Sequence, residues 1–171
     1  MATVLITGTN RGLGLEFVKR FCQQGDDVIA TCRNSSKAPE LQALSEANSS
    51  LRLMNLDVSD QESMASFASA LGDAAIDVFI NNAGVYGPRN ANFGNVASGD
   101  WESVLRVNAI SPMLLTQLII SNLRLGNTGR RRSRNGTSGT ARRKKKIREG
   151  ICYGRMPKRC LTTGVRPQDK E

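Results

Sequence analysis

The chain has 171 residues, enough for one domain of ordinary size, and its 39% apolar and 23% charged residues are typical of a soluble, folded protein. Its formal net charge of +9 is unevenly distributed, because residues 1–129 carry 9 Lys and Arg against 12 Asp and Glu, whereas residues 130–171 carry 15 against 3. The composition excludes wholesale disorder and a uniformly basic nucleic-acid-binding fold, and it predicts a domain boundary at 129/130.

Residue types that the chain lacks exclude several kinds of site. It contains no histidine, so it can hold no Ser-His-Asp triad, imidazole base or His-containing metal site. The cysteines form no C-x-x-C pair, which favours reduced thiols over a zinc site or a disulfide framework; they are Cys22, Cys32, Cys152 and Cys160. We therefore expect no bound metal.

No segment of the sequence resembles a targeting signal or a membrane anchor. The N-terminus lacks a basic region followed by a long apolar one. The most apolar later stretch, residues 113–120, is far shorter than the ~20 residues needed to span a bilayer. We expect a cytoplasmic protein without a membrane partner.

Predicted strands and helices alternate along the first three quarters of the chain. Short apolar runs that end at Gly, Asp or Asn predict buried strands over residues 3–7, 28–32, 51–56 and 76–80. Apolar residues at helical spacing predict helices over residues 13–23, 36–48, 59–71 and 99–125. This alternation predicts an α/β fold, a Rossmann-type doubly wound parallel sheet with helices on both faces.

Two predicted helices carry specific local signals. Ser59 and Glu62 have the spacing of a capping box, which would begin the helix that ends near Leu71. Pro112 lies inside the helix predicted over 99–125 and is expected to kink or split it, because proline cannot donate the helical hydrogen bond.

Beyond Gly129 the sequence changes character. The basic clusters at 130–134 and 142–146 have neither the period of a strand nor that of a helix, and few apolar residues lie between them. Such a segment cannot bury enough surface to offset its ordering entropy, so residues 130–171 are predicted to form a disordered basic tail.

A glycine-rich turn follows the first predicted strand and precedes the first predicted helix. Its sequence, Thr-Gly-Thr-Asn-Arg-Gly-Leu-Gly at 7–14, lies where the pyrophosphate of a dinucleotide binds in such folds. The three glycines would permit a sharp exit from the strand, a close approach of the backbone to phosphate and tight helix packing. A purely structural turn is the alternative. The predicted cofactor-binding residues here are Gly8, Asn10, Arg11, Gly12, Leu13 and Gly14.

The end of the second predicted strand bears on the choice of cofactor. An acidic residue there would bind the ribose hydroxyl of NAD, whereas an arginine accommodates the 2′-phosphate of NADP. The sequence Thr31-Cys32-Arg33 contains no acid. Arg33 therefore favours NADP, with NAD as the alternative cofactor and a solvated loop arginine as the structural alternative.

Four motifs, in this order and at these intervals, resemble those of the short-chain dehydrogenase/reductase family. They are the glycine turn at 7–14, Leu-Asp-Val at 56–58, Asn-Asn-Ala-Gly at 81–84 and Val-Asn at 107–108. The amino-acid sequence of the glycine turn is most similar to the corresponding sequences of C-factor-like proteins and carbonyl reductases, one branch of this family. The resemblance covers residues 1–129.

The resemblance implies roles for residues at these motifs. Asn108 would hold a water in the proton relay of the active site, and Arg11 together with Arg33 would favour the 2′-phosphate of NADP. The residues expected on the adenosine side of the cofactor are Asp57, Val58, Asn82, Ala83 and Gly84. The implied reaction is hydride transfer between the nicotinamide and a small carbonyl or alcohol substrate.

The family's catalytic pair is missing from this sequence. The resemblance implies a tyrosine general acid with a lysine four residues later, but position 157, four residues after Tyr153, is proline. Ser133 and Ser138 are weak candidates for the family's serine. We therefore expect a chain that binds its cofactor and is catalytically impaired, since general acid–base catalysis contributes about 10²–10⁴ in rate.

The family's further strands are also missing. An apolar fifth strand should follow Gly129, where the sequence has Arg130–Arg132 instead. A shifted reading frame or a misjoined gene model would produce such a change. Loss of these strands would leave the helix over 99–125 without packing partners, and the resemblance implies that this helix takes part in subunit assembly, so we expect a homo-oligomer through that helix, or aggregation. The alternative function is a non-enzymatic nucleotide-binding or signalling protein with a polyanion-binding tail, although nucleic acid is disfavoured because Tyr153 is the tail's only aromatic residue.

Overall fold

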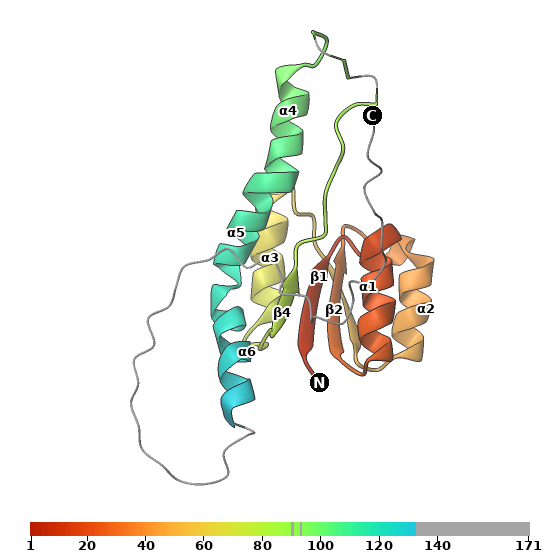
Figure 1. The fold of residues 1–171 in the computed structure, drawn as a ribbon, viewed down its shortest axis with the longest axis vertical. Helices are drawn as coiled ribbons and strands as arrows, with labels where there is room; N and C mark the ends of the chain where they lie inside the picture. The colour runs from red at the N-terminus through yellow and green to blue at the C-terminus, as the bar shows by residue number, and fades with distance from the viewer. Residues whose placement is uncertain (90, 93, 133–171) are drawn as a thin grey trace, which may run out of the picture. The chain divides into compact units, whose positions relative to one another are not determined.

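The computed structural model describes residues 1–89, 91–92 and 94–132, which contain a four-stranded parallel sheet (Figure 1). The strands are β1 (Thr3–Thr7), β2 (Asp27–Cys32), β3 (Leu51–Asn55) and β4 (Val78–Ile80), in the order β3-β2-β1-β4. Leu5 of β1 is in register with Ile29 of β2 and with Phe79 of β4. The predicted α/β fold with a Rossmann-type sheet is confirmed, and the carboxyl ends of all four strands lie at one edge.

Helices connect the strands and continue after β4. Those between the strands are α1 (Gly12–Gln23), the 3₁₀ turn η1 (Ser35–Lys37), α2 (Pro39–Ala47) and α3 (Gln61–Leu71). Those after β4 are α4 (Ser98–Leu105), the π-helical segment η2 (Arg106–Ile110), α5 (Ser111–Leu118) and α6 (Ile120–Arg132). The helix predicted over 36–48 is divided because Pro39 disfavours helical backbone at Ala38 and is itself the first residue of α2.

The two central strands, β1 and β2, bury both of their faces, each under a separate layer of helices. Val4 and Ile6 of β1 pack in one core cluster with Leu15 of α1 and Leu41 of α2. Leu5 points to the other face, where the second cluster includes residues of α3 and α5. Alternate residues of a strand point to opposite faces, so an almost continuously apolar run is what a sheet covered on both sides requires.

Two local predictions near α3 and β4 are wrong. Asp60, rather than Ser59, caps α3: its carboxylate accepts hydrogen bonds from the backbone N–H groups of Glu62 (3.1 Å) and Ser63 (3.3 Å). The predicted strand over 76–80 begins only at Val78, because the N–H of Ile76 donates to the carbonyl of Asn122 in α6 (3.0 Å) instead of to a strand.

The break expected at Pro112 lies elsewhere. The helical run from Ser98 to Leu118 is continuous, and a bend of 63° separates it from α6 at Ile119. The wider π-helical turn just before Pro112 accommodates the proline, whose ring would otherwise clash with the carbonyl four residues earlier. Among the described residues, no single helix is both long and apolar enough to cross a membrane; the two parts of this bent run meet the criteria only when combined.

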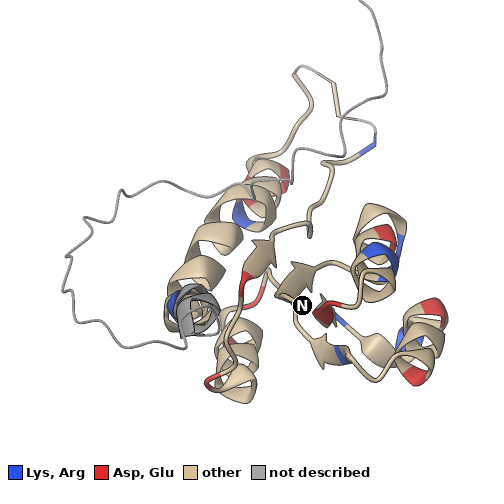
Figure 2. Cartoon of the chain, turned by 60° about the horizontal axis from the view of Figure 1, so that its bottom comes forward, with Lys and Arg blue, Asp and Glu red and all other residues tan. Residues whose placement is uncertain are grey.

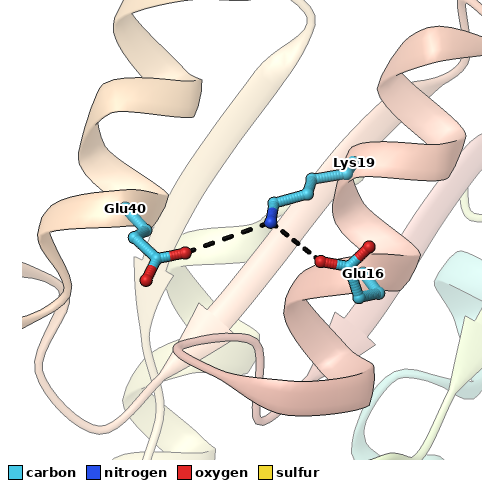
Figure 3. A network of polar contacts seen from close by, with 3 residues as sticks. All are labelled: Glu16, Lys19 and Glu40. Carbon is cyan, nitrogen blue, oxygen red and sulfur yellow. Dashed lines mark hydrogen bonds and ion pairs between the residues drawn. The ribbon is translucent and has the colours of Figure 1, made fainter.

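A network of ionic contacts joins the outer surfaces of α1 and α2 (Figure 3). Lys19 Nζ lies 2.8 Å from Glu16 Oε1 on α1 and 4.0 Å from Glu40 Oε2 on α2. The hydrogen bond to Glu16 raises the pKa of Lys19 above its ordinary value, against a smaller opposing effect of burial. Because Glu16 and Glu40 are exposed and Lys19 is only half-buried, water screens these contacts and they add little to the stability of the fold.

The substitution Glu16→Gln is expected to lower the pKa of Lys19 toward its ordinary value, because the charged acceptor of its shorter contact is removed. A raised lysine pKa means that the ion pair stabilises the fold below the ordinary lysine pKa and that this contribution is lost as pH rises through the folded-state value. An NMR titration of the Lys19 side chain measures the shift. An unchanged pKa in the variant would show that Glu16 is not its cause.

Candidate cofactor-binding site

The glycine turn leaves β1 at the carboxyl edge of the sheet and enters α1. Gly8 and Gly12 have positive φ angles of +69° and +58°, a backbone region that strains residues with a side chain. Gly14 is buried, and a Cβ atom there would collide with the carbonyl oxygen of Gly8 and the side-chain amide nitrogen of Asn82. Between these glycines, Asn10, Arg11 and Leu13 are exposed.

Buried threonines fasten this turn to β2. The backbone N–H of Thr9 donates to the carbonyl of Thr31 at 3.0 Å, and the Thr9 hydroxyl donates to the same oxygen at 3.1 Å. The Thr31 hydroxyl in turn donates to the carbonyl of Ile6 (3.3 Å). Arg33 follows Thr31 by two residues and is exposed, so Arg11 and Arg33 emerge at the same edge of the sheet. The sequence analysis missed Thr9, because turn residues are usually exposed and only the three-dimensional packing buries this one.

Asn82 and Thr7 join the ends of β4 and β1. The Asn82 side-chain amide donates to the carbonyls of Thr7 and Gly8, both at 3.0 Å. The Thr7 hydroxyl accepts hydrogen bonds from the backbone N–H groups of Asn82 (3.1 Å) and Ala83 (3.0 Å). Both amide hydrogens of Asn82 are therefore used to hold the glycine turn. Thr7 was not singled out from the sequence, where it resembles an ordinary strand residue.

Asp57 follows β3 at the same edge. Its Oδ1 atom accepts hydrogen bonds from the backbone N–H (2.9 Å) and the hydroxyl (2.6 Å) of Ser59. Its own N–H donates to the hydroxyl of Ser63 in α3 (2.9 Å). These contacts fix the carboxylate and involve only one of its two oxygens. Val58, the next residue, is half-buried.

Asn108, in the π-helical segment, holds the loop that follows β4. Its side-chain oxygen accepts a hydrogen bond from the N–H of Val85 (2.9 Å), and its side-chain amide donates to the Val85 carbonyl (2.8 Å). A Cβ atom at Gly84 would lie 3.3 Å from this side-chain oxygen, so glycine permits the close approach. Pro112, four residues after Asn108, has no N–H to donate to the Asn108 carbonyl.

Other chemical groups in the described part of the chain do not build a second site of this kind. Burial raises the pKa values of Cys22 and Cys32, which disfavours reactive thiolates. No group of three or more acidic or cysteine residues is placed to hold a metal ion within the described ranges. A surface hollow of about 360 Å³, lined in part by Thr3, Asp27 and Arg52, lies at the amino ends of the strands, away from the glycine turn.

Several predicted features fall outside the described residues. Ser133, Ser138 and Tyr153 lie there, as does the predicted tail beyond Arg132. The backbone of α6 continues to Arg132, which is past the end predicted for the helix over 99–125.

Known proteins match this chain over the part that the structure describes. The short chain dehydrogenase family model matches residues 2–131. The short chain dehydrogenase gsfK of Penicillium aethiopicum is 38% identical over 133 residues, which cover 75% of this chain and 53% of that protein. Retinol dehydrogenase 12 of Bos taurus is 34% identical over 127 residues, which cover 71% of this chain and 39% of that protein.

Solved structures lead to the same family. The NADPH-bound carbonyl reductase from chicken fatty liver has a TM-score of 0.71 at 32% identity, over 76% of this chain and 51% of that one. The carbonyl reductase Sniffer of D. melanogaster has a TM-score of 0.70 at 28% identity, over 77% of this chain and 56% of that one. This chain spans about half the length of these relatives, or less. They include carbonyl reductases, as the sequence predicted, whereas the C-factor part of the resemblance stays a prediction. The chain belongs to the short chain dehydrogenase family.

Proposed function

We propose that residues 1–132 form the NADP(H)-binding half of an oxidoreductase that transfers hydride between the nicotinamide and a small carbonyl or alcohol. The observation that carries this proposal is the conformation of the glycine turn, which hydrogen bonds of Thr7, Thr31 and Asn82 hold in place. The turn leads into α1, whose first turn contains no acidic residue and whose N-cap residue, Arg11, makes no side-chain capping bond. The positive end of the helix dipole is therefore unopposed where the pyrophosphate would lie.

Two exposed arginines support NADP over NAD. Arg11 and Arg33 emerge at one edge of the sheet, where a 2′-phosphate could accept charge-assisted hydrogen bonds from their guanidinium groups. No carboxylate follows β2 to bind a free ribose hydroxyl. Solved relatives with NADPH or NADP bound, from chicken fatty liver and Burkholderia multivorans, agree with this choice.

The remaining residues of the edge fit the rest of the cofactor and the proton relay. The second carboxylate oxygen of Asp57 would accept a hydrogen bond from the adenine amino group, and Val58 would lie against the adenine ring. Leu13, which is 74% exposed at the start of α1, offers an apolar contact to the cofactor. Asn108 would hold a water through its backbone carbonyl, since its side chain is occupied by Val85.

We propose that the 171-residue chain turns over poorly by itself. Tyr86 and Tyr153 are its tyrosines, and the residues four positions later are asparagine and proline, so no tyrosine–lysine pair can act as the general acid. We expect its rate of carbonyl reduction to be lower by about 10²–10⁴ than that of its relatives. Robust NADPH-dependent reduction by this polypeptide would contradict that expectation.

The substitution Arg33→Ala tests the cofactor assignment. We expect it to weaken NADPH binding about 10- to 100-fold and to leave NADH binding nearly unchanged, because a charge-assisted hydrogen bond contributes about 1.5–3 kcal/mol. Isothermal titration calorimetry of the full chain with each cofactor measures both affinities. Arg20→Ala, an exposed arginine in the last turn of α1, is the matched control. Equal losses for NADPH and NADH, or no binding by the unchanged chain, would refute the proposal.

A second proposed function, binding of a polyanion without catalysis, is supported by the charge of residues 130–171 alone. Such binding releases counterions and weakens steeply with salt. Retention of the full chain on immobilised RNA above physiological salt would support a selective interaction. Loss of retention near physiological salt would indicate only nonspecific attraction.

A further inference from the structure

Two buried threonines join the glycine turn to the end of β2. The carbonyl oxygen of Thr31 accepts two hydrogen bonds from Thr9, one from its backbone N–H (3.0 Å) and one from its hydroxyl (3.1 Å). Both bonds lie past Thr7, where β1 ends, so they hold the turn itself against β2. The Thr9 hydroxyl adds a second donor to an oxygen that is already hydrogen-bonded, so the burial of that oxygen does not explain why position 9 carries a hydroxyl.

Two exposed arginines follow these threonines. Arg11 comes two residues after Thr9 in the turn, and Arg33 comes two residues after Thr31. Two residues of extended chain span at most about 7 Å, so each arginine starts close to a fixed point. Within the described part of the chain, neither guanidinium group makes a hydrogen bond or an ion pair. The distance between the two groups therefore depends on their backbones, which the contact of Thr9 with Thr31 holds together.

A second contact fixes the chain on the other side of Arg33. Asn55, the last residue of β3, accepts at Oδ1 a hydrogen bond from the backbone N–H of Ser35 (2.9 Å). Asn34 is the N-cap of the 3₁₀ turn η1, and its Oδ1 atom accepts from the N–H (3.0 Å) and the hydroxyl (2.6 Å) of Ser36. The backbone of Arg33 thus lies between the end of β2 and a turn that β3 anchors.

The charge of the neighbouring helices does not by itself favour a second phosphate on the cofactor. Helix α1 carries both acidic and basic residues, and the charged residues of α2 beside it are acidic (Figure 2). An anion therefore meets no uniformly positive field on this side of the sheet. Discrimination of a 2′-phosphate then requires individual guanidinium groups within hydrogen-bonding distance, and fixing their backbones before the cofactor arrives lowers the entropy lost on binding.

We propose that Thr9 and Asn55 are positioning residues that give this chain its preference for NADP(H) over NAD(H). This inference rests on the proposed cofactor-binding function. The Thr9 hydroxyl fixes Arg33 relative to Arg11, and Asn55 fixes the turn that follows Arg33. Both residues act on the 2′-phosphate through Arg33, so their loss should weaken binding of NADPH and leave binding of a cofactor with a free ribose hydroxyl nearly unchanged.

The substitution Thr9→Val tests the inference because it removes the hydroxyl and keeps the volume of the side chain. We expect it to weaken NADPH binding by the full chain about tenfold and NADH binding by less than about twofold, as measured by isothermal titration calorimetry. Asn55→Ala should have the same effect, whereas Thr9→Ser should retain the preference. Thr116→Val is the matched control and should change neither affinity, since the Thr116 hydroxyl also donates to a carbonyl, that of Pro112 in α5 (2.6 Å).

A double-mutant cycle separates positioning from a general effect on the fold. If Thr9 acts through Arg33, Thr9→Val should have little further effect on NADPH affinity in a chain that already carries Arg33→Ala. Additive losses of affinity would overturn the inference. An unchanged ratio of NADPH to NADH affinity in either Thr9→Val or Asn55→Ala would also overturn it. Thr9→Ala provides the same measurement if the valine variant does not fold.

The unsubstituted chain distinguishes failure of this inference from failure of the proposed function. If it binds neither cofactor, or binds NADPH and NADH equally, the proposed NADP(H) function fails and the positioning role fails with it. If it prefers NADPH and the variants of Thr9 and Asn55 keep that preference, the positioning role alone is refuted.

Discussion

The substitution Gly14→Ala is expected to abolish detectable NADPH binding and to lower the free energy of unfolding by about 3 kcal/mol, since overpacking a close contact costs about 1–3 kcal/mol or more. The added methyl group would collide with the carbonyl of Gly8 and the amide of Asn82, and both are held in place by hydrogen bonds between β1 and β4. Relief of the clash would separate α1 from the turn. Urea unfolding and cofactor titration of the full chain measure the two effects.

Gly12→Ala is the informative control for this experiment. Gly12 has a positive φ of +58°, but a Cβ atom there meets no heavy atom within 4 Å. Its cost should therefore be limited to backbone strain of about 1–2 kcal/mol. Its effect on cofactor binding should exceed its effect on stability, because the methyl group occupies the space that phosphate would take. Equal destabilisation by both substitutions would show that close packing is not the reason for glycine at position 14.

The substitution Asn122→Ala is expected to destabilise the fold by about 2–4 kcal/mol, because it leaves two backbone carbonyls without their donor at about 1–3 kcal/mol each. The buried Asn122 amide donates to the carbonyls of Gly72 (2.7 Å) and Ala74 (2.8 Å). The backbone carbonyl of Asn122 accepts a hydrogen bond from the backbone N–H of Ile76 (3.0 Å). Asn122 fixes the chain as it enters β4, so the variant should also bind NADPH more weakly. Urea unfolding measures the loss of stability, and titration with NADPH measures the loss of affinity.

Asn122→Asp gives the sharper form of this test. The carboxylate keeps the shape of the amide but has no hydrogen to donate and adds a buried charge, so it should destabilise the fold at least as much as alanine. Ser121→Ala, an exposed neighbour on α6, should change stability by less than about 0.5 kcal/mol. A loss of stability below about 1 kcal/mol for Asn122→Asp would contradict the proposal that the Asn122 side chain holds the carbonyls of Gly72 and Ala74.

The bend in the long helix shows that the position of a helix break cannot always be predicted from neighbouring residues. The sequence predicts it at Pro112, the residue that lacks a helical donor. The structure instead absorbs the proline with a π-helical turn and bends at Ile119, which is buried against α3 and the sheet. The position of the bend is decided by packing against residues distant in sequence, and no local signal at Ile119 reports it. The cap of α3 is a different case, because a local contact decides it: the Ser59 hydroxyl donates to the carboxylate of Asp57, two residues earlier, and Asp60 becomes the N-cap.

The sequence by itself determined the alternation of strands and helices, the parallel sheet and the place of the glycine turn. Each of these depends on short-range periodicity or on the backbone freedom of glycine, both of which are properties of neighbouring residues. Only the tertiary structure decided that Asn82 and Thr7 tie β4 to the turn, that Thr9 is buried and that Asn122 fixes the start of β4. These contacts join residues 22 to 76 positions apart, and their polar side chains have no periodic pattern in the sequence. These contacts are favourable because they provide hydrogen bonds to buried backbone groups. The groups become buried, and so need such partners, only once the sheet and its helices have packed.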